Sequence, residues 1–198
     1  MSLLESNWKT VAAQVAMALL LGVPTVPTFA QDSSDEFSPR QQFMQDLETM
    51  ESKFLELADA MDADMYGWSP MEDVRTVSEV YMLIAGENYV MPSAWGAEPP
   101  EGMTEVSFAM FAELAKTVDK AEVLDHLRKS FAYCKQTIQA ISDADMNKKI
   151  RFFGAERSLG ESLYVMASDM HEHLGQAIAY ARMNHVVPPW TARRQQGQ

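Results

Sequence analysis

The sequence predicts an all-α protein built as a bundle of four helices. Four segments place apolar residues at intervals of three and four, which is the spacing of one buried helix face. A helix-capping residue precedes each of these segments, and the alternation typical of strands is almost absent. The length of 198 residues and the hydrophobic content of 47% suit one globular domain of ordinary size.

The first helix is predicted to begin after Ser38. Ser38 suits an N-cap, and Pro39 follows it at the first helical position, where a missing N–H costs nothing. Apolar residues then recur at helical spacing from Phe43 to Met61. Gly67, a turn-favouring residue, lies beyond the end of this pattern.

The second helix is predicted to begin after a capping box formed by Thr76 and Glu79, and to stop at Pro92. A long connection follows at residues 91–118, with a short helix expected at residues 108–115. Because this connection is long enough to cross the bundle, the helices on either side of it are predicted to run parallel.

The third and fourth helices are also marked by their caps. Asp119 precedes apolar residues that keep helical spacing to about residue 141. Ser158 and Glu161 form a further capping box, and the helix that follows is predicted to continue to about residue 183. The sequence thus predicts a bundle domain over residues 38–190.

Two shorter segments lie outside the helical patterns. Residues 148–154 are predicted to form an extended or turn segment, and Arg151 and Arg157 flank its glycine. These arginines are candidates for binding an acidic ligand, although surface salt bridges are the alternative. Residues 186–190 are predicted to be extended, and residues 191–198 to form a polar tail.

The first 30 residues are organised like a secretory signal peptide. Lys9 precedes an almost uncharged run of 13 residues at positions 11–23, and a small-residue cleavage site ends at Ala30. A membrane-spanning helix needs ~20 residues, so this run is short for an anchor. We expect cleavage after Ala30, export to the periplasm or secretion, and a flexible lead at residues 31–37. An uncleaved anchor is the alternative.

Charge and cysteine content exclude several classes of function. The chain has 16 Lys and Arg against 28 Asp and Glu, which gives a net charge of −12. This charge argues against nucleic acid as a partner and against an anionic membrane surface, since both are bound by clustered cationic side chains. The single cysteine excludes a disulfide framework within the chain and any metal site that needs several cysteines.

A candidate metal-binding pair lies on the last predicted helix. Asp169 and His173 are four residues apart, so both side chains leave the same face of the helix. A carboxylate and an imidazole at this spacing can bind one metal ion together. His171 is two residues from His173, about 200° around the helix, and does not serve the same ion.

Several short motifs resemble those of the DinB/YfiT-like superfamily. They are Trp68 before the second helix, the stretch that begins at Arg75, the run from His173 to Gln176, and the closing segment at residues 178–190. The resemblance covers nearly all of the chain after residue 30. It implies a four-helix bundle with a long connection between the second and third helices, often assembled as a homodimer.

The resemblance also implies a metal site, which this sequence modifies. The family typically has three histidine ligands, and their positions fall here on Leu83, Asp169 and His173. Leucine has no ligating atom, but Glu87 lies one turn further along the same face of the second helix. We predict a site of Glu87, Asp169 and His173 for one divalent ion, with Mn²⁺ or Fe²⁺ favoured over Ni²⁺ or Zn²⁺. The alternative is a metal-free pair of His173 and Asp169, with Leu83 filling the vacated space.

Three functional hypotheses follow. The first is an exported binding or structural module with a degenerate metal site and an unknown small-molecule ligand. The second, implied by the resemblance, is a divalent-metal-dependent enzyme of the thiol S-transferase or hydrolase kind, for which no catalytic residue is assigned. The third is a protein acting on damaged DNA, which the family name suggests and the charge of −12 opposes.

Overall fold

A computed structural model describes residues 37–197, and four long helices form its bundle. The predictions for the signal segment and for most of the flexible lead lie outside the described residues. The bundle helices are α2 (Pro39–Ala60), α3 (Val77–Val90), α5 (Lys120–Ala140) and α6 (Leu159–Met183). The all-α prediction is therefore confirmed.

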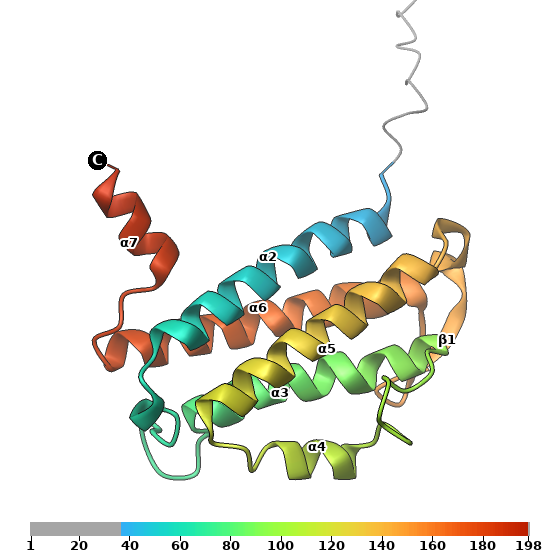
Figure 1. The fold of residues 1–198 in the computed structure, drawn as a ribbon. Helices are drawn as coiled ribbons and strands as arrows, with labels where there is room; N and C mark the ends of the chain where they lie inside the picture. Colours follow the sequence, from blue (N-terminus) through green and yellow to red (C-terminus); the bar gives the residue numbers. More distant parts are fainter. Residues whose placement is uncertain (1–36, 198) are drawn as a thin grey trace, which may run out of the picture. The chain divides into compact units, whose positions relative to one another are not determined.

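The connection between α3 and α5 crosses the bundle. Figure 1 shows that α3 and α5 run in the same direction, whereas α2 and α6 run in the opposite one. The connection contains the 3-10 helix η2 (Met91–Trp95) and the short helix α4 (Phe108–Leu114). Both the parallel arrangement and the short helix were predicted from the sequence. The connection matters for function because it forms part of a cavity described below.

The helix caps are those that the sequence predicted. Residues Ser38, Thr76, Asp119 and Ser158 each accept a hydrogen bond from the first turn of their helices. At α3 the box is reciprocal: the Glu79 amide donates to Thr76 Oγ1 at 3.3 Å, and the Thr76 amide donates to Glu79 Oε2 at 2.7 Å. Each cap satisfies N–H groups that a helix start leaves unpaired, and this fixes where the helices begin.

Aromatic residues fill the centre of the bundle. Phe54 from α2 packs against Tyr81 from α3 and Phe131 from α5, with ring centroids 6.4 and 6.1 Å apart. Tyr66, which precedes α3 near the 3-10 helix η1 (Ala63–Met65), packs against Tyr81 as well. Cys134 is completely buried in the same core, and burial raises the pKa of its thiol. It therefore behaves as a small apolar residue.

A β-hairpin separates α5 from α6. Strands β1 (Lys149–Phe152) and β2 (Ala155–Ser158) pair antiparallel after the 3-10 helix η3 (Asp143–Asn147). Phe153 and Gly154 join the strands with φ of 47° and 76°, the left-handed pair typical of two-residue hairpin turns. The sequence predicted an extended or turn segment here, and the structure resolves it into a hairpin whose tip reaches the cavity.

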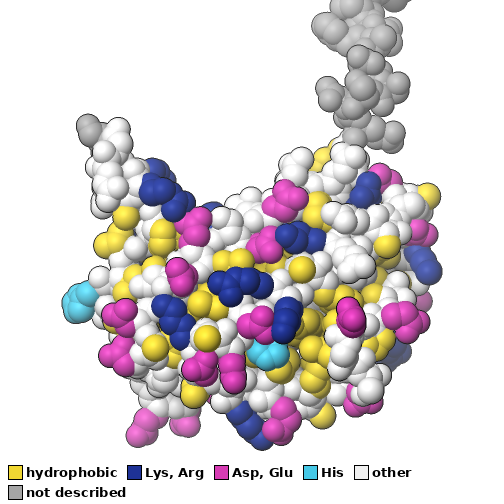
Figure 2. Space-filling view, in the orientation of Figure 1, with side chains coloured by type: hydrophobic (Ala, Val, Ile, Leu, Met, Phe, Trp, Pro, Cys, Tyr) yellow, Lys and Arg dark blue, Asp and Glu magenta, His cyan; other side chains and the backbone are white. Residues whose placement is uncertain are grey.

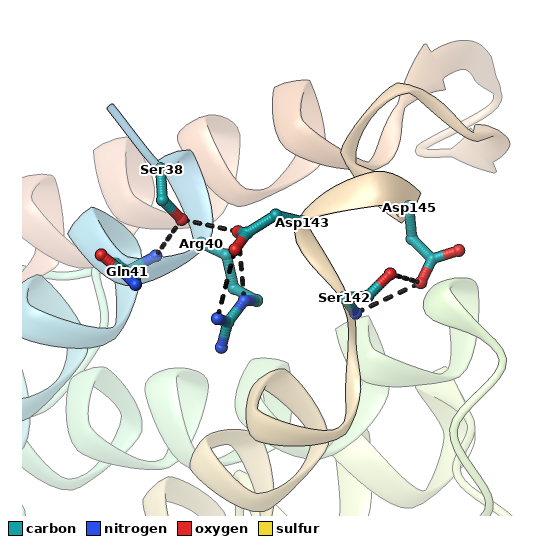
Figure 3. Close-up of polar contacts among 6 residues, drawn as sticks. All are labelled: Ser38, Arg40, Gln41, Ser142, Asp143 and Asp145. Atoms are coloured by element: carbon teal, nitrogen blue, oxygen red, sulfur yellow. Dashed lines mark hydrogen bonds and ion pairs between the residues drawn. The ribbon is translucent and has the colours of Figure 1, made fainter. Parts of the chain in front are cut away.

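Polar contacts attach the start of α2 to the segment before the hairpin. Ser38 Oγ donates to Asp143 Oδ1 at 2.6 Å, and Arg40 Nε donates to the same carboxylate at 3.2 Å (Figure 3). Ser142 and Asp145 close the turn beside them. The ion pair is exposed, so it contributes little to stability. It connects the start of α2 to η3.

The end of the chain differs in part from the prediction of an extended segment at residues 186–190 and a polar tail at residues 191–198: residues 186–188 lie outside any helix, but a helix follows. Residues Pro189–Gln196 form a helix, α7, that packs on α2. Arg193 Nη1 lies 2.8 Å from Glu56 Oε2, and Trp190 packs against the core. The two consecutive prolines suggested an extended segment, but Pro189 occupies the first turn of α7, where proline is tolerated.

The surface of the bundle is mixed in charge. Figure 2 shows lysine and arginine interspersed with aspartate and glutamate over the face it presents, so this face carries no continuous basic patch. Among residues 37–197, no helix is long and apolar enough to cross a membrane.

Candidate functional site

One face of α3 borders a cavity of about 510 Å³. The α3 wall consists of Leu83, Gly86, Glu87 and Val90, which follow one another at intervals of three, one and three residues and so share a face. Leu83 is only 6% exposed and lines the cavity. The predicted common face of Leu83 and Glu87 is confirmed.

The opposite walls come from segments far away in the sequence. Phe111 from α4 closes one side, and Phe152 with Phe153 at the hairpin tip closes another. Phe111 approaches α3 so closely that a Cβ on Gly86 would lie 1.9 Å from its ring. Arg151 on β1 is the only cationic side chain of the cavity lining in the described part of the chain. The cavity is therefore apolar except for a carboxyl group on one wall and a guanidinium on another.

Glu87 also contacts Asp169 on α6. Their oxygens Glu87 Oε2 and Asp169 Oδ2 are both buried, and neither has a hydrogen-bond donor among the described residues. Burial, followed by the hydrogen bond and the negative charge of Asp169, raises the pKa of Glu87 to about 9; Arg75 opposes this increase. At neutral pH Glu87 therefore holds its proton and can donate a hydrogen bond to Asp169.

A row of polar side chains continues from Asp169 along α6. His173 Nε2 lies 3.6 Å from Asp169 Oδ1, and His173 Nδ1 lies 3.1 Å from Gln176 Oε1. Gln176 Nε2 donates to the Tyr180 hydroxyl at 3.0 Å. Because Gln176 donates through Nε2, its Oε1 accepts, so Nδ1 of His173 carries a hydrogen and Nε2 is the ring nitrogen that faces Asp169. Trp68 covers the end of the row, with its ring centroid 5.5 Å from that of Tyr180.

The predicted ligands lie near one another but form two pairs. Asp169 contacts Glu87 on one side and approaches His173 on the other. Among residues 37–197, no group of three or more His, Cys, Asp and Glu side chains is arranged to hold a metal ion. Leu83 offers no donor, so the residues do not fit a three-histidine site. A metal at Glu87, Asp169 and His173 stays a prediction.

His171 lies outside this row, as its angular offset on the helix predicted. Its Nε2 contacts Asp46 on α2, 2.9 Å from Oδ1, at an exposed position. The two histidines of this stretch therefore have separate partners, and only His173 faces the candidate site.

Comparison with known proteins identifies the family. The profile of the DinB superfamily matches residues 46–177, about two thirds of the chain. The chain belongs to the DinB superfamily. The matched region contains Leu83, Glu87, Asp169 and His173, so all the residues of the candidate site lie within the family's common part.

Two solved structures share the DinB fold of this chain. A DinB-like protein from Bacillus cereus superposes with a TM-score of 0.64 at 18% identity, over 75% of this chain and 95% of the other. A conserved protein from Enterococcus faecalis superposes with a TM-score of 0.59 at 20% identity, over 74% of this chain and 96% of the other. No curated protein matches this chain in sequence. At these identities the likeness establishes the fold alone.

The sequence did not reveal the full site of this DinB protein. Glu87, Asp169 and His173 were singled out, but the contact between the two carboxyl groups was not. The aromatic walls at Phe111 and Phe152 were missed, because neither carries a motif and both come from outside the long helices. A half-buried Phe on a seven-residue helix with an apolar face was the only available signal.

Proposed function

We propose that this protein is an exported binding module of the DinB superfamily, with a degenerate metal position and a small-molecule site in the cavity beside Leu83 and Glu87. The observation that carries the proposal is the burial of Leu83 on the wall of that cavity. An apolar side chain stands where the family typically places a metal ligand, and it faces a space large enough for an organic molecule.

The state of the neighbouring polar groups supports the same proposal. A metal ion at this position would need Glu87 and Asp169 to be deprotonated. Instead, burial and Asp169 raise the pKa of Glu87 to about 9, so Glu87 holds a proton at neutral pH. A metal ion would have to displace that proton, which weakens the binding of a cation at this position.

Metal analysis of the purified protein tests the degenerate site. We expect far less than one metal ion per chain after incubation with Mn²⁺, Fe²⁺, Ni²⁺ or Zn²⁺ at pH 7 and removal of the excess ions. The protein should be purified without a chelating tag, and His173→Ala is the matched control. Near-stoichiometric metal in the wild type that disappears in His173→Ala would overturn the proposal.

That outcome would favour the alternative, a divalent-metal-dependent enzyme that uses Asp169, His173 and Glu87. One observation supports the alternative: Asp169 contacts Glu87 and also lies 3.6 Å, through Oδ1, from His173 Nε2. Because the metal would have to displace the proton on Glu87, its binding should strengthen as the pH rises toward 9. Assembly as a homodimer is compatible with either function.

Export is a separate part of the proposal and has its own test. It is supported by the pattern of residues 9–30, which lie outside the described structure. After expression of the full chain in a bacterium, we expect the protein in the periplasmic or secreted fraction, with Gln31 as its first residue on N-terminal sequencing. Recovery of an intact N-terminus from the cytoplasm would contradict export, and recovery from membranes would favour the uncleaved anchor.

A further inference from the structure

We infer that the cavity binds amphipathic monocarboxylates, with the apolar body between Phe111 and the hairpin tip and the carboxylate at Arg151. This inference rests on the proposed function and specifies the class of ligand. It follows from the distribution of charge around the cavity, from the aromatic walls, and from the polarity of the inner end.

The hairpin is a basic segment of an acidic protein. Residues 149–158 contain three cationic side chains and one anionic side chain, so their net charge is 3 − 1 = +2, against −12 for the chain. Lys149 and Arg151 lie two residues apart on β1, and their side chains therefore leave the same face of the strand. A smaller hollow of about 200 Å³ is lined by both of them together with Ile150 and Glu156, and it shares Arg151 with the cavity.

Arg151 is available to a ligand. It is exposed, and no ion pair is formed by Arg151 or Lys149 among residues 37–197. Glu156 is its cross-strand neighbour, but the structure contains no salt bridge between them in the described region. A guanidinium at the edge of an apolar cavity can bind a carboxylate through two parallel hydrogen bonds.

The apolar and acidic residues of the cavity determine which non-ionic part of a ligand fits and how many negative charges it can carry. Phe111, Phe152 and Phe153 supply aromatic surface, and Val90 with Met91 supplies aliphatic surface. The inner wall carries Glu87, and the negative charge of Asp169 lies behind it, so a second anionic group at that end would be repelled by Asp169. A ligand with a single anionic group at one end satisfies both conditions, whereas a dicarboxylate or a polyphosphate does not.

Calorimetric titration of the full chain with three ten-carbon probes tests the inference. The probes are decanoate, decanol and decyltrimethylammonium, which differ only in the charge of the head group. We expect decanoate to bind one per chain and at least about tenfold more tightly than decanol, as one charge-assisted contact predicts. Decyltrimethylammonium should bind most weakly.

Variants locate the binding and separate the two proposals. Arg151→Ala should weaken decanoate binding about tenfold and leave decanol unchanged, whereas Arg182→Ala, at the far end of α6, should change neither. Ala94→Phe, which fills the cavity, should abolish binding of both probes, with Val90→Trp as a second filling variant. Ala97→Phe, which faces a different groove, should not affect binding.

Each alternative outcome has a distinct meaning. Equal affinity for decanoate and decanol, or insensitivity to Arg151→Ala, would overturn the monocarboxylate inference and leave the cavity as a binding site. Binding that survives Ala94→Phe and Val90→Trp would place the probes elsewhere, the apolar run at residues 11–23 included. No binding of any probe, or binding elsewhere, would count against the proposed function itself.

Discussion

Replacing Glu87 with glutamine is expected to stabilise the protein by up to about 5 kcal/mol at pH 8 and to have little effect below pH 5. In the unfolded chain a glutamate is ionised at pH 8, whereas in the fold burial and Asp169 raise the pKa of Glu87 to about 9. Folding at pH 8 therefore requires the uptake of a proton. A glutamine donates an N–H to Asp169 at any pH and avoids this cost.

The sign of the pH dependence follows from proton counts. Between the ordinary pKa of glutamate, 4.5, and the raised pKa of about 9, the folded state holds one proton more than the unfolded state. The contribution of Glu87 to the free energy of unfolding therefore falls as the pH rises through this window, and below the window it is constant. Glu87→Gln should remove this part of the dependence.

Urea denaturation of wild type and Glu87→Gln at pH 4.5, 6 and 8 measures the effect. Glu172→Gln, an exposed substitution on the same helix as Asp169, is the control and should change the free energy of unfolding by less than about 0.5 kcal/mol. An equal gain at all three values of pH would mean that Glu87 takes up no proton on folding. A loss at pH 8 would mean that its negative charge is stabilised by a partner such as a bound cation.

Features of the structure that depend on residues close together in the sequence were predicted correctly from the sequence. The caps at Ser38, Thr76, Asp119 and Ser158 were predicted correctly because each depends on hydrogen bonds within one helical turn. The common face of Leu83 and Glu87 was likewise predictable, since it follows from helix geometry alone.

The features that were missed depend on contacts between distant segments. The pKa of Glu87 is set mainly by burial and by Asp169, which lies 82 residues further along the chain, at a distance that only the packing of α3 against α6 determines. The helix at α7 is held by Trp190 and by the pair of Arg193 with Glu56 on α2, and the sequence of the tail does not reveal that partner. The cavity has the same origin, because α4 and the hairpin supply its walls.

Gly86 provides the second large effect, because it allows α4 to close the cavity. An alanine in the middle of a helix usually stabilises it by about 1 kcal/mol relative to glycine. At Gly86, however, the added Cβ would lie 1.9 Å from Phe111 Cδ2 and 2.3 Å from Cε2, so the ring must leave its place. We expect Gly86→Ala to destabilise the protein by about 1–3 kcal/mol and to expose the amides of α4 to hydrogen exchange.

The molecule contains a matched control for this substitution. Gly175 lies within helix α6, and a Cβ there would meet nothing within 4 Å. Gly175→Ala should therefore stabilise the protein by about 0.5–1 kcal/mol, as helix propensity alone predicts. Urea denaturation of the two variants should give free-energy changes of opposite sign. Stabilisation by both would mean that Phe111 does not pack on Gly86.

A double substitution separates the clash from any other role of Gly86. Once Phe111→Ala has removed the ring, Gly86→Ala should become stabilising by about 1 kcal/mol, the same sign as Gly175→Ala. A penalty that persists in the Phe111→Ala background would place the conflict elsewhere around α3. The change of sign would also link α4 to the ligand, because the ring that Gly86 admits is a wall of the cavity. Gly86→Ala should then weaken decanoate binding although Arg151 is unchanged. In that case Gly86, which allows α4 to pack closely on α3, also determines the shape of the cavity.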